Sequence, residues 1–242
     1  MCEHCQPSLA ALSRRTVIAG AGALLAASAV PFAPGCAAEP PGPDAPNAVP
    51  PAAALDRLMQ GNVRYAAGES EWEDYSVGRA ERVAAQYPIA AILGCSDSRV
   101  SPELLFDQGP GDLFVVRLAG NFLDDDGFAS LEYAVQFLGA PLVMVLGHTN
   151  CGAVAAAVKV VTERAELPGH LPDLVKAIEP AVIAAHGRHP SDLVAAATEE
   201  NVRINVKRLI DNAPIMTDAL AAKKIAISGG IYDIATGKVN LI

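Results

Sequence analysis

Residues 89–99 read Ile-Ala-Ala-Ile-Leu-Gly-Cys-Ser-Asp-Ser-Arg, an apolar run that gives way abruptly to polar side chains. The apolar part is typical of a buried β-strand. Alternate side chains of an extended chain share a face, so Cys95, Asp97 and Arg99 can all point the same way where the strand ends. The pattern therefore predicts a thiol, a carboxylate and a guanidinium group in a row at the end of a strand.

A second apolar run ends in the same manner about fifty residues later. Residues 142–146 read Leu-Val-Met-Val-Leu, as expected for a central parallel strand that is covered on both faces. The segment that follows, residues 147–152, places His148 and Cys151 three positions apart. Because parallel sheets carry their sites at the carboxyl ends of strands, we expect both polar clusters at one edge of a sheet.

Cys95, His148 and Cys151 make up a zinc-ligand set with one position open. Structural zinc sites are usually closed by four Cys or His ligands, whereas catalytic sites keep a place for water. The domain has no other cysteine, and we expect its remaining histidines on the surface or in loops: His170, His186 and His189. Water or Asp97 would then take the fourth position. The alternatives are a structural zinc site, or two buried free cysteines beside a core histidine.

Asp97 and Arg99 indicate how the open position could be used. A carboxylate two residues from a ligand can bind the metal or accept a hydrogen bond from a metal-bound hydroxide. Arg99 can hold that carboxylate off the metal through two parallel N–H bonds. Zinc brings the pKa of its water close to neutrality, which favours hydration or hydrolysis of a small electrophilic carbon. The alternative is an ordinary Asp–Arg surface pair.

The length of 242 residues and the 51% apolar content favour one sizeable domain, which we place at residues 53–242. Hydrophobic spacing and turn residues predict strands at 89–94, 113–118, 142–146, 224–228 and 238–242. They predict helices at 53–61, 78–86, 128–138, 151–164, 171–186 and 191–212. Alternating helices and strands indicate an α/β fold with a mainly parallel sheet flanked by helices.

Charge and cysteine usage exclude several classes of protein. The net charge of −9 at pH 7 argues against a nucleic-acid or anionic-membrane surface as a partner. Of the five cysteines, Cys2, Cys5 and Cys36 lie in or beside the N-terminal segment. The two that remain for the domain cannot provide a disulfide framework.

Residues 1–38 are interpreted as an export signal of the twin-arginine type. Arg14 and Arg15 stand directly before a run of 23 residues, 16–38, that carries no charge. A transmembrane anchor is the alternative, since such a run could cross a bilayer. Its high Ala and Gly content and its prolines argue against that alternative. We therefore expect an exported protein, periplasmic or extracellular.

The region after the signal bears on how the mature chain begins. Ala27-Ser28-Ala29 fits a small-residue cleavage site, while Cys36 is an alternative first residue that would carry a lipid anchor. Residues 39–52 are rich in proline, which removes N–H donors and fixes φ. We expect this segment to be a stiff, solvated tether.

The chain resembles the β-class carbonic anhydrases in the sequence and order of several segments. The strongest matches are residues 94–100, 110–117, 131–135 and 147–154, with weaker ones at 61–65 and 232–239. The combination of Cys-x-Asp-x-Arg with His-x-x-Cys is highly specific. The resemblance implies a Rossmann-like three-layer fold and zinc on Cys95, His148 and Cys151. It also implies that Asp97 either binds the metal in an inactive state or pairs with Arg99 in the active one.

The resemblance further implies reversible hydration of CO₂ to bicarbonate and a proton by a zinc-bound hydroxide. Gln86 matches a glutamine that hydrogen-bonds bicarbonate, and Gly152 matches a backbone N–H donor. Phe114 and Tyr133 match apolar pocket walls that a partner supplies in part across a dimer interface. A homodimer or larger homo-oligomer is therefore expected.

Two departures from the family pattern bear on the pocket and its regulation. Many members read Arg-Asn-x-Ala-Asn where residues 117–121 read Arg-Leu-Ala-Gly-Asn, so one pocket wall should be smaller or reshaped. Members with a regulatory bicarbonate site carry tryptophan at the position of Ile92, so we expect no such switch here.

Two other functions remain open on sequence alone. The same zinc site could hydrolyse carbonyl sulfide or carbon disulfide, as relatives with this motif set can do. The protein could instead bind bicarbonate or store zinc without catalysis, although mere binding would not require the pair of Asp97 and Arg99.

Overall fold

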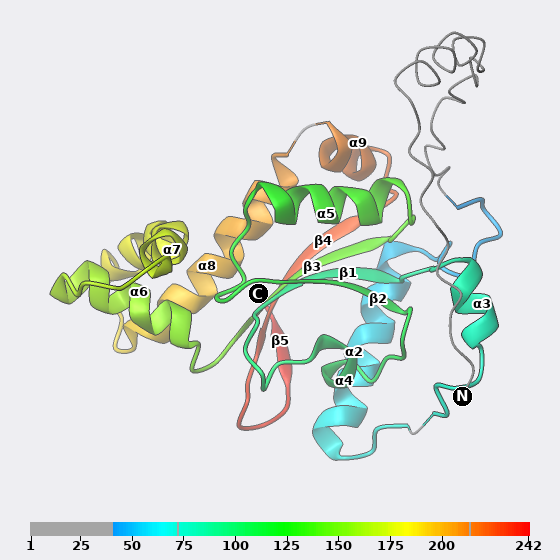
Figure 1. Ribbon diagram of the computed structural model, residues 1–242, viewed down its shortest axis with the longest axis horizontal. Coiled ribbons are helices and arrows are strands. Elements are labelled where there is room, and N and C mark those ends of the chain that lie inside the picture. Colours follow the sequence, from blue (N-terminus) through cyan, green and yellow to red (C-terminus); the bar gives the residue numbers. More distant parts are fainter. Residues whose placement is uncertain (1–40, 72, 213) are drawn as a thin grey trace, which may run out of the picture. The chain divides into compact units, whose positions relative to one another are not determined.

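The computed structural model describes residues 41–71, 73–212 and 214–242 (Figure 1). The predicted export signal, the cleavage site, Cys36 and the first residues of the tether lie outside this part of the chain. Among the residues described, no helix combines the length and apolar character needed to cross a membrane.

Five strands form a single sheet in the order β2-β1-β3-β4-β5. Their bounds are β1 Ala90–Gly94, β2 Leu113–Arg117, β3 Leu142–His148, β4 Ala226–Tyr232 and β5 Val239–Leu241. The first four are parallel, and β5 pairs antiparallel with β4. The expected mainly parallel α/β sheet is confirmed. Since Gly94 pairs with both Arg117 and Leu146, the carboxyl ends of β1, β2 and β3 meet at one edge.

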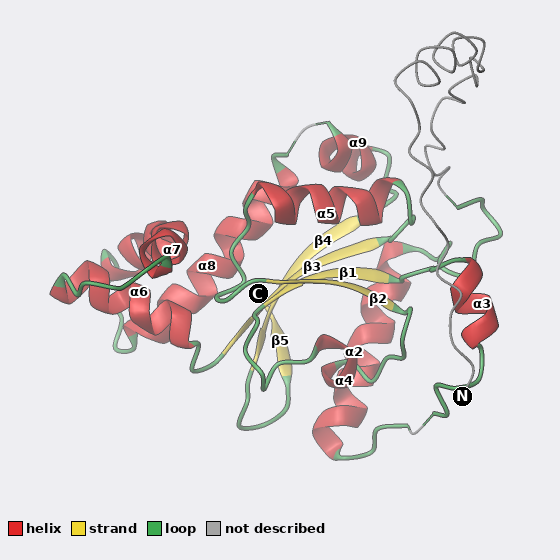
Figure 2. Cartoon of the chain, in the orientation of Figure 1, coloured by secondary structure: helices red, strands yellow, loops and turns green. Residues whose placement is uncertain are grey.

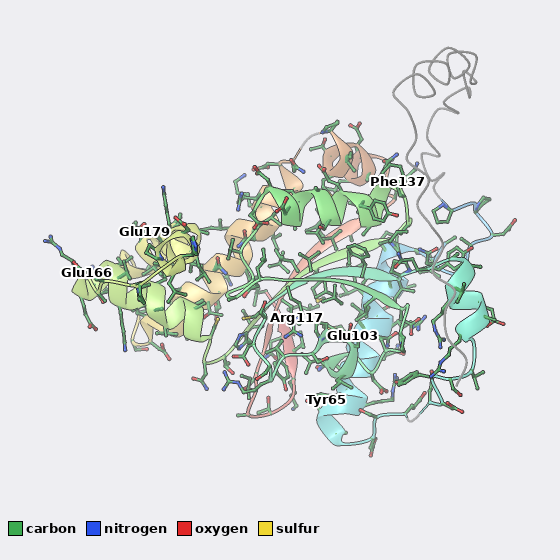
Figure 3. All side chains as sticks on the ribbon, viewed as in Figure 1. Tyr65, Glu103, Arg117, Phe137, Glu166 and Glu179 are labelled. Atoms are coloured by element: carbon green, nitrogen blue, oxygen red, sulfur yellow. The ribbon has the colours of Figure 1, made fainter. Side chains whose placement is uncertain are left out.

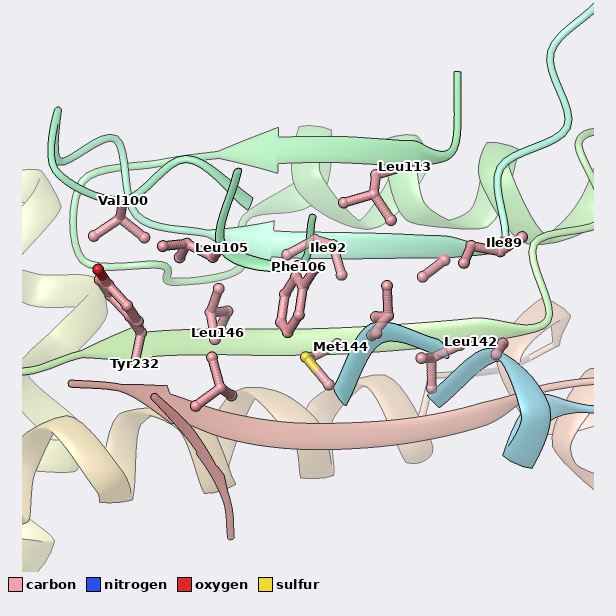
Figure 4. Packing of buried hydrophobic residues seen from close by; sticks show 14 residues of the cluster. Ile89, Ile92, Val100, Leu105, Phe106, Leu113, Leu142, Met144, Leu146 and Tyr232 are labelled. Carbon is pink, nitrogen blue, oxygen red and sulfur yellow. The ribbon is translucent and has the colours of Figure 1, made fainter. Parts of the chain in front are cut away.

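Helices cover both faces of the sheet (Figure 2). Their bounds are α2 Pro51–Ala67, α3 Arg79–Ala84, α4 Pro102–Leu105, α5 Asp125–Gln136, α6 Gly152–Glu163, α7 Leu171–His186, α8 Leu193–Ile210 and α9 Ile215–Ala221. On one face, α2 and α4 cover the strands. Phe106, the residue after α4, packs beside Met144 and Leu146 (Figure 4), and Leu58 of α2 belongs to the same buried cluster. On the other face, α5, α8 and α9 enclose a second core. Every residue of β1 and β3 is buried, which explains their unbroken apolar sequences.

A third apolar cluster lies where α6, α7 and α8 come together. It includes both Cys95 and Cys151, together with Val154 and Ile178. The two thiols are therefore built into a packed interior rather than placed on a mobile loop.

The two largest boundary errors, of four residues or more, concern α2 and β4, and close packing of glycine explains both. Helix α2 continues six residues past Gly61, its expected end, because a glycine lets the helix lie directly against the carbonyl of Phe106. Strand β4 continues past its expected end to Tyr232. A Cβ at Gly229 would lie 2.8 Å from Cγ1 of Val202, so glycine is needed there for α8 to approach the strand. The short helices α4 and α9 were not predicted.

The described part of the proline-rich segment is not a freely solvated tether. Asn47 is buried, and its Nδ2 donates to the carbonyl oxygens of Pro88 at 3.0 Å and Leu138 at 2.7 Å. Helix α2 then begins at Pro51, two residues before the expected domain boundary. One asparagine thus fastens this segment to the domain, while most of its neighbours stay at the surface.

Candidate metal centre

The sheet brings the three predicted ligands together from separate segments. Cys95 follows β1, His148 is the last residue of β3, and Cys151 is the N-cap of α6. All three are buried, and their ligand atoms lie within 4.8 Å of one another. The helix predicted at 151–164 therefore begins at the second thiol, where its N-terminus favours negative charge.

The imidazole of His148 is oriented as a metal ligand would be. Its Nδ1 lies 2.9 Å from the carbonyl oxygen of Thr149, and because a carbonyl can only accept, Nδ1 carries the proton. Nε2 then has a free lone pair. It is buried and has no hydrogen-bond partner among the described residues. This orphaned acceptor beside two free thiols fits a thiophilic metal ion, for which a backbone carbonyl on the far nitrogen is the usual support.

The two thiols are electrostatically unequal. The sulfur of Cys95 accepts the backbone N–H groups of Gly120 at 3.2 Å and Asp97 at 3.4 Å. Interaction with the Cys151 thiol, together with His148 and these N–H groups, lowers the pKa of Cys95 to about 4 despite its burial. The adjacent Cys95 thiolate, and then burial, raise the pKa of Cys151 far above its usual value. Cys95 is therefore the thiol that ionises more readily, and a bound cation would favour the thiolate form of both residues.

Asp97 is gripped by Arg99 rather than placed among the ligand atoms. Nε of Arg99 donates to Oδ1 at 2.9 Å, and Nη2 donates to Oδ2 at 2.7 Å. This hydrogen-bonded pair holds the pKa of Asp97 well below its ordinary range. Oδ2 still lies 4.0 Å from Nε2 of His148, so the carboxylate stands at the edge of the ligand cluster. Of the two predicted states, the structure has the paired one.

Arg117 supports the turn that carries Cys95 and Asp97. From the carboxyl end of β2, its Nε donates to the carbonyl of Cys95 at 2.9 Å and its Nη2 to that of Asp97 at 2.7 Å (Figure 3). Arg117 lies in a segment that matches the family, but its sequence position alone indicated no role. Thr149, whose carbonyl fixes the His148 tautomer, lies in another such segment, and Gly120 lies in the segment that departs from the family pattern.

The predicted pocket residues separate into two groups. Gly152 adjoins Cys151, and no heavy atom lies within 4 Å of the place a Cβ would occupy, so its backbone is open to a small molecule. Gln86 instead lies exposed before β1, so the whole length of that five-residue strand, roughly 15 Å, separates it from Cys95. Phe114 is near the start of β2 and meets Tyr133 of α5 at 6.3 Å between ring centroids. These last three residues do not line the ligand cluster of their own chain.

Comparison with known proteins agrees with this geometry. Residues 90–239 match the family model described as carbonic anhydrase. Carbonic anhydrase 2 of Mycobacterium tuberculosis is 38% identical over 192 residues, which cover 79% of this chain and 92% of the relative. The solved β-carbonic anhydrase CcaA is 28% identical with a TM-score of 0.60, covering 77% of this chain and 94% of that one. A structure from a study of two tetrameric β-carbonic anhydrases of Sordaria macrospora has the same fold, at 23% identity and a TM-score of 0.64, covering 78% and 97%. The chain therefore belongs to the β class of the carbonic anhydrase family.

Proposed function

We propose that this protein is a zinc-dependent carbonic anhydrase that interconverts CO₂ with bicarbonate and a proton. The observation that carries the proposal is a three-donor cluster with an ionised, arginine-held carboxylate at its edge. A structural zinc site would be closed by a fourth protein ligand, and a storage site would not require Asp97. The sulfurs of Cys95 and Cys151 and Nε2 of His148 would hold the ion. Zinc supplies a Lewis acid that makes water a nucleophile near neutral pH.

The remaining chemistry belongs to the side chains and backbone around the cluster. Asp97, kept ionised by Arg99, accepts a hydrogen bond from the attacking water and turns its lone pair toward the carbon of CO₂. The open N–H of Gly152 donates to the oxygen on which charge develops. Arg117 keeps the turn, and with it the carboxylate, in place. The released proton passes to buffer.

A second copy of the chain completes the pocket in this proposal. Gln86 and Tyr133 are exposed and Phe114 is half-buried, and none of the three lines the ligand cluster of its own chain. Strand β2, which carries Phe114, is an edge strand. The family resemblance assigns all three to substrate contacts, and for Phe114 and Tyr133 it implies pocket walls supplied in part across a dimer interface. This supports a homodimer or larger homo-oligomer.

Stopped-flow CO₂ hydration by the zinc-loaded protein tests this function. Activity should disappear when a chelator removes the metal, return with zinc, and be absent in Cys151→Ala. Carbonyl sulfide and carbon disulfide should be assayed in parallel. Rapid hydrolysis of either without CO₂ hydration would replace the proposed substrate, and stoichiometric zinc with neither activity would favour a binding protein.

Export of the mature protein is proposed on the strength of residues 1–38. The paired residues Arg14 and Arg15 support a route that carries folded proteins, so zinc could be bound before the thiols meet an oxidising compartment. Cell fractionation with mass determination of the mature N-terminus checks this. A chain starting with a lipid on Cys36 would identify a membrane-anchored form, while an uncut cytosolic chain would reject export.

A further inference from the structure

Gly120 lies beside Cys95, where the packing and backbone conformation of this chain suit glycine. Its N–H donates to the sulfur of Cys95 at 3.2 Å. Its φ of +85° is left-handed, and a Cβ would lie 2.5 Å from Cδ1 of Ile178 and 3.0 Å from Cβ of Ala153. Residues 117–121 depart from the family pattern at this position. The departure therefore lies beside a thiol ligand.

A glycine by itself would not keep this conformation, because glycine adopts positive and negative φ angles about equally well. The anchor comes from helix α8, where Nδ2 of Asn201 donates to the carbonyl of Gly120 at 2.8 Å. Asn201 is only 2% exposed. A buried amide in a helix is unfavourable unless its hydrogen bonds are made, so this contact accounts for a polar residue in the interior.

Asn205, four residues further along the same helix, holds the side chain of Asn201 in place. Its Nδ2 donates to Oδ1 of Asn201 at 3.1 Å and to the carbonyl of that residue at 2.8 Å. Its own Oδ1 accepts the N–H of Leu123 at 3.1 Å. Both ends of the Gly120–Leu123 loop are thus tied to one helix face by two asparagines that are each 2% exposed.

We propose that Asn201, braced by Asn205, is a positioning residue for the Cys95 ligand. By fixing the Gly120 carbonyl it keeps the neighbouring N–H aimed at the Cys95 sulfur. That hydrogen bond withdraws charge from the thiolate and fixes its direction, as second-shell partners of metal ligands do. This role rests on the proposed zinc centre. Helix α8 contributes no ligand to that centre, but through Asn201 it would adjust the charge and direction of the Cys95 thiolate.

The test uses the full chain loaded with Co²⁺, whose thiolate-to-metal absorption reports the electron density on sulfur. In Asn201→Ala this band should move to longer wavelength, and competition with a chelator should show zinc binding weakened by about 10-fold. Asn205→Ala should shift both in the same direction by less. Asn47→Ala is the matched control, because it also removes a buried asparagine that donates to backbone carbonyls. Its partners, Pro88 and Leu138, precede β1 and β3, at the opposite end of these strands from Cys95 and His148. Its spectrum should equal that of the wild type.

The outcomes separate the two proposals. If the wild type binds neither Co²⁺ nor Zn²⁺ in stoichiometric amount, the metal centre itself is rejected. If it binds both, and Asn201→Ala keeps the wild-type spectrum and affinity, the positioning role is rejected. Should Asn201→Ala not fold, nuclear magnetic resonance on the cadmium-loaded wild type decides instead. Coupling between cadmium and the Gly120 amide proton is expected through the N–H···S bond, and its absence would overturn the inference.

Discussion

Asp97 is a carboxylate whose every neighbour keeps it charged and oriented. The backbone N–H of Arg99 and both arms of its guanidinium donate to the two oxygens. Arg117 holds the carbonyl of the same residue. Asp97 can therefore accept a hydrogen bond from water but has no proton to donate at working pH. In the proposed reaction, Asp97 would therefore set the direction of attack without being one of the three metal ligands.

Replacing Asp97 by asparagine should reduce kcat/KM for CO₂ hydration by about 100-fold or more, because an amide is a weaker acceptor and turns a donor toward Arg99. Zinc content should stay at the wild-type level. Stopped-flow kinetics and metal analysis check both. Asp107→Asn is the control, since Asp107 also pairs with an arginine, Arg64 at 2.6 Å, but away from the ligand cluster. A kcat/KM within twofold of the control would contradict the role of Asp97.

Gly120→Ala tests the close approach to the third apolar cluster. The left-handed φ and the contact with Ile178 should together lower the free energy of unfolding by about 2–4 kcal/mol. Urea denaturation measures this. Ile178→Val removes the clashing methyl group, so the double variant should lose less than the sum of the two single variants. Gly187→Ala, at a φ of −61°, should change stability by less than about 1 kcal/mol. Additive losses would mean that the clash is relieved by movement of the loop.

The ligands could be predicted from residue type and spacing because zinc chemistry demands specific donors and parallel strands end at a common edge. Arg117 and Gly120 could not be assigned roles in this way. Their contributions are made through backbone groups, which look the same in every sequence. Asn201 gave no signal at all, because an asparagine on a helix is usually at the surface.

At the scale of elements, the bounds of apolar strands were predicted more accurately than those of strands interrupted by glycine. Strands β1 and β3 are buried along their whole length and were predicted within two residues at each end. The predicted end of strand β4 at residue 228 was too early, because the pair Gly229-Gly230 that follows is typical of a turn. Helix α8 was placed correctly, but its polar residues were not expected in the interior, since only the neighbouring loop explains them.

Asn47 gives the proline-rich segment a structural role that its composition did not predict. Asn47→Ala should lower the free energy of unfolding by about 2 kcal/mol, because two buried carbonyls lose their donor. Thermal or urea unfolding provides the measurement. Asp44→Ala, an exposed change in the same segment, should be neutral within about 0.5 kcal/mol. If the two variants were equally stable, Asn47 would not fasten the segment to the domain, and the segment would be a free tether.

At the scale of the whole molecule, one chain has its Cys-His-Cys group at one end of the sheet, whereas the three residues predicted for the substrate pocket lie elsewhere. Phe114, Tyr133 and Phe137 form an aromatic group, with Tyr133 and Phe137 at 5.4 Å between centroids. Tyr133 is 43% exposed, which is unusual for a ring with two aromatic neighbours. In the proposed homo-oligomer, a second chain would cover this group.

Complementation between two inactive variants tests such sharing of a site. Cys151→Ala lacks a metal ligand, and Gln86→Ala lacks the predicted bicarbonate contact, so each homo-oligomer should have little activity. In a mixed dimer, one site combines intact ligands from one chain with an intact glutamine from the other. Co-expression in equal amounts should therefore restore about one quarter of the wild-type sites, because half of the dimers are mixed and each has one complete site. Activity no higher than the mean of the two parents would show that Gln86 serves only its own chain.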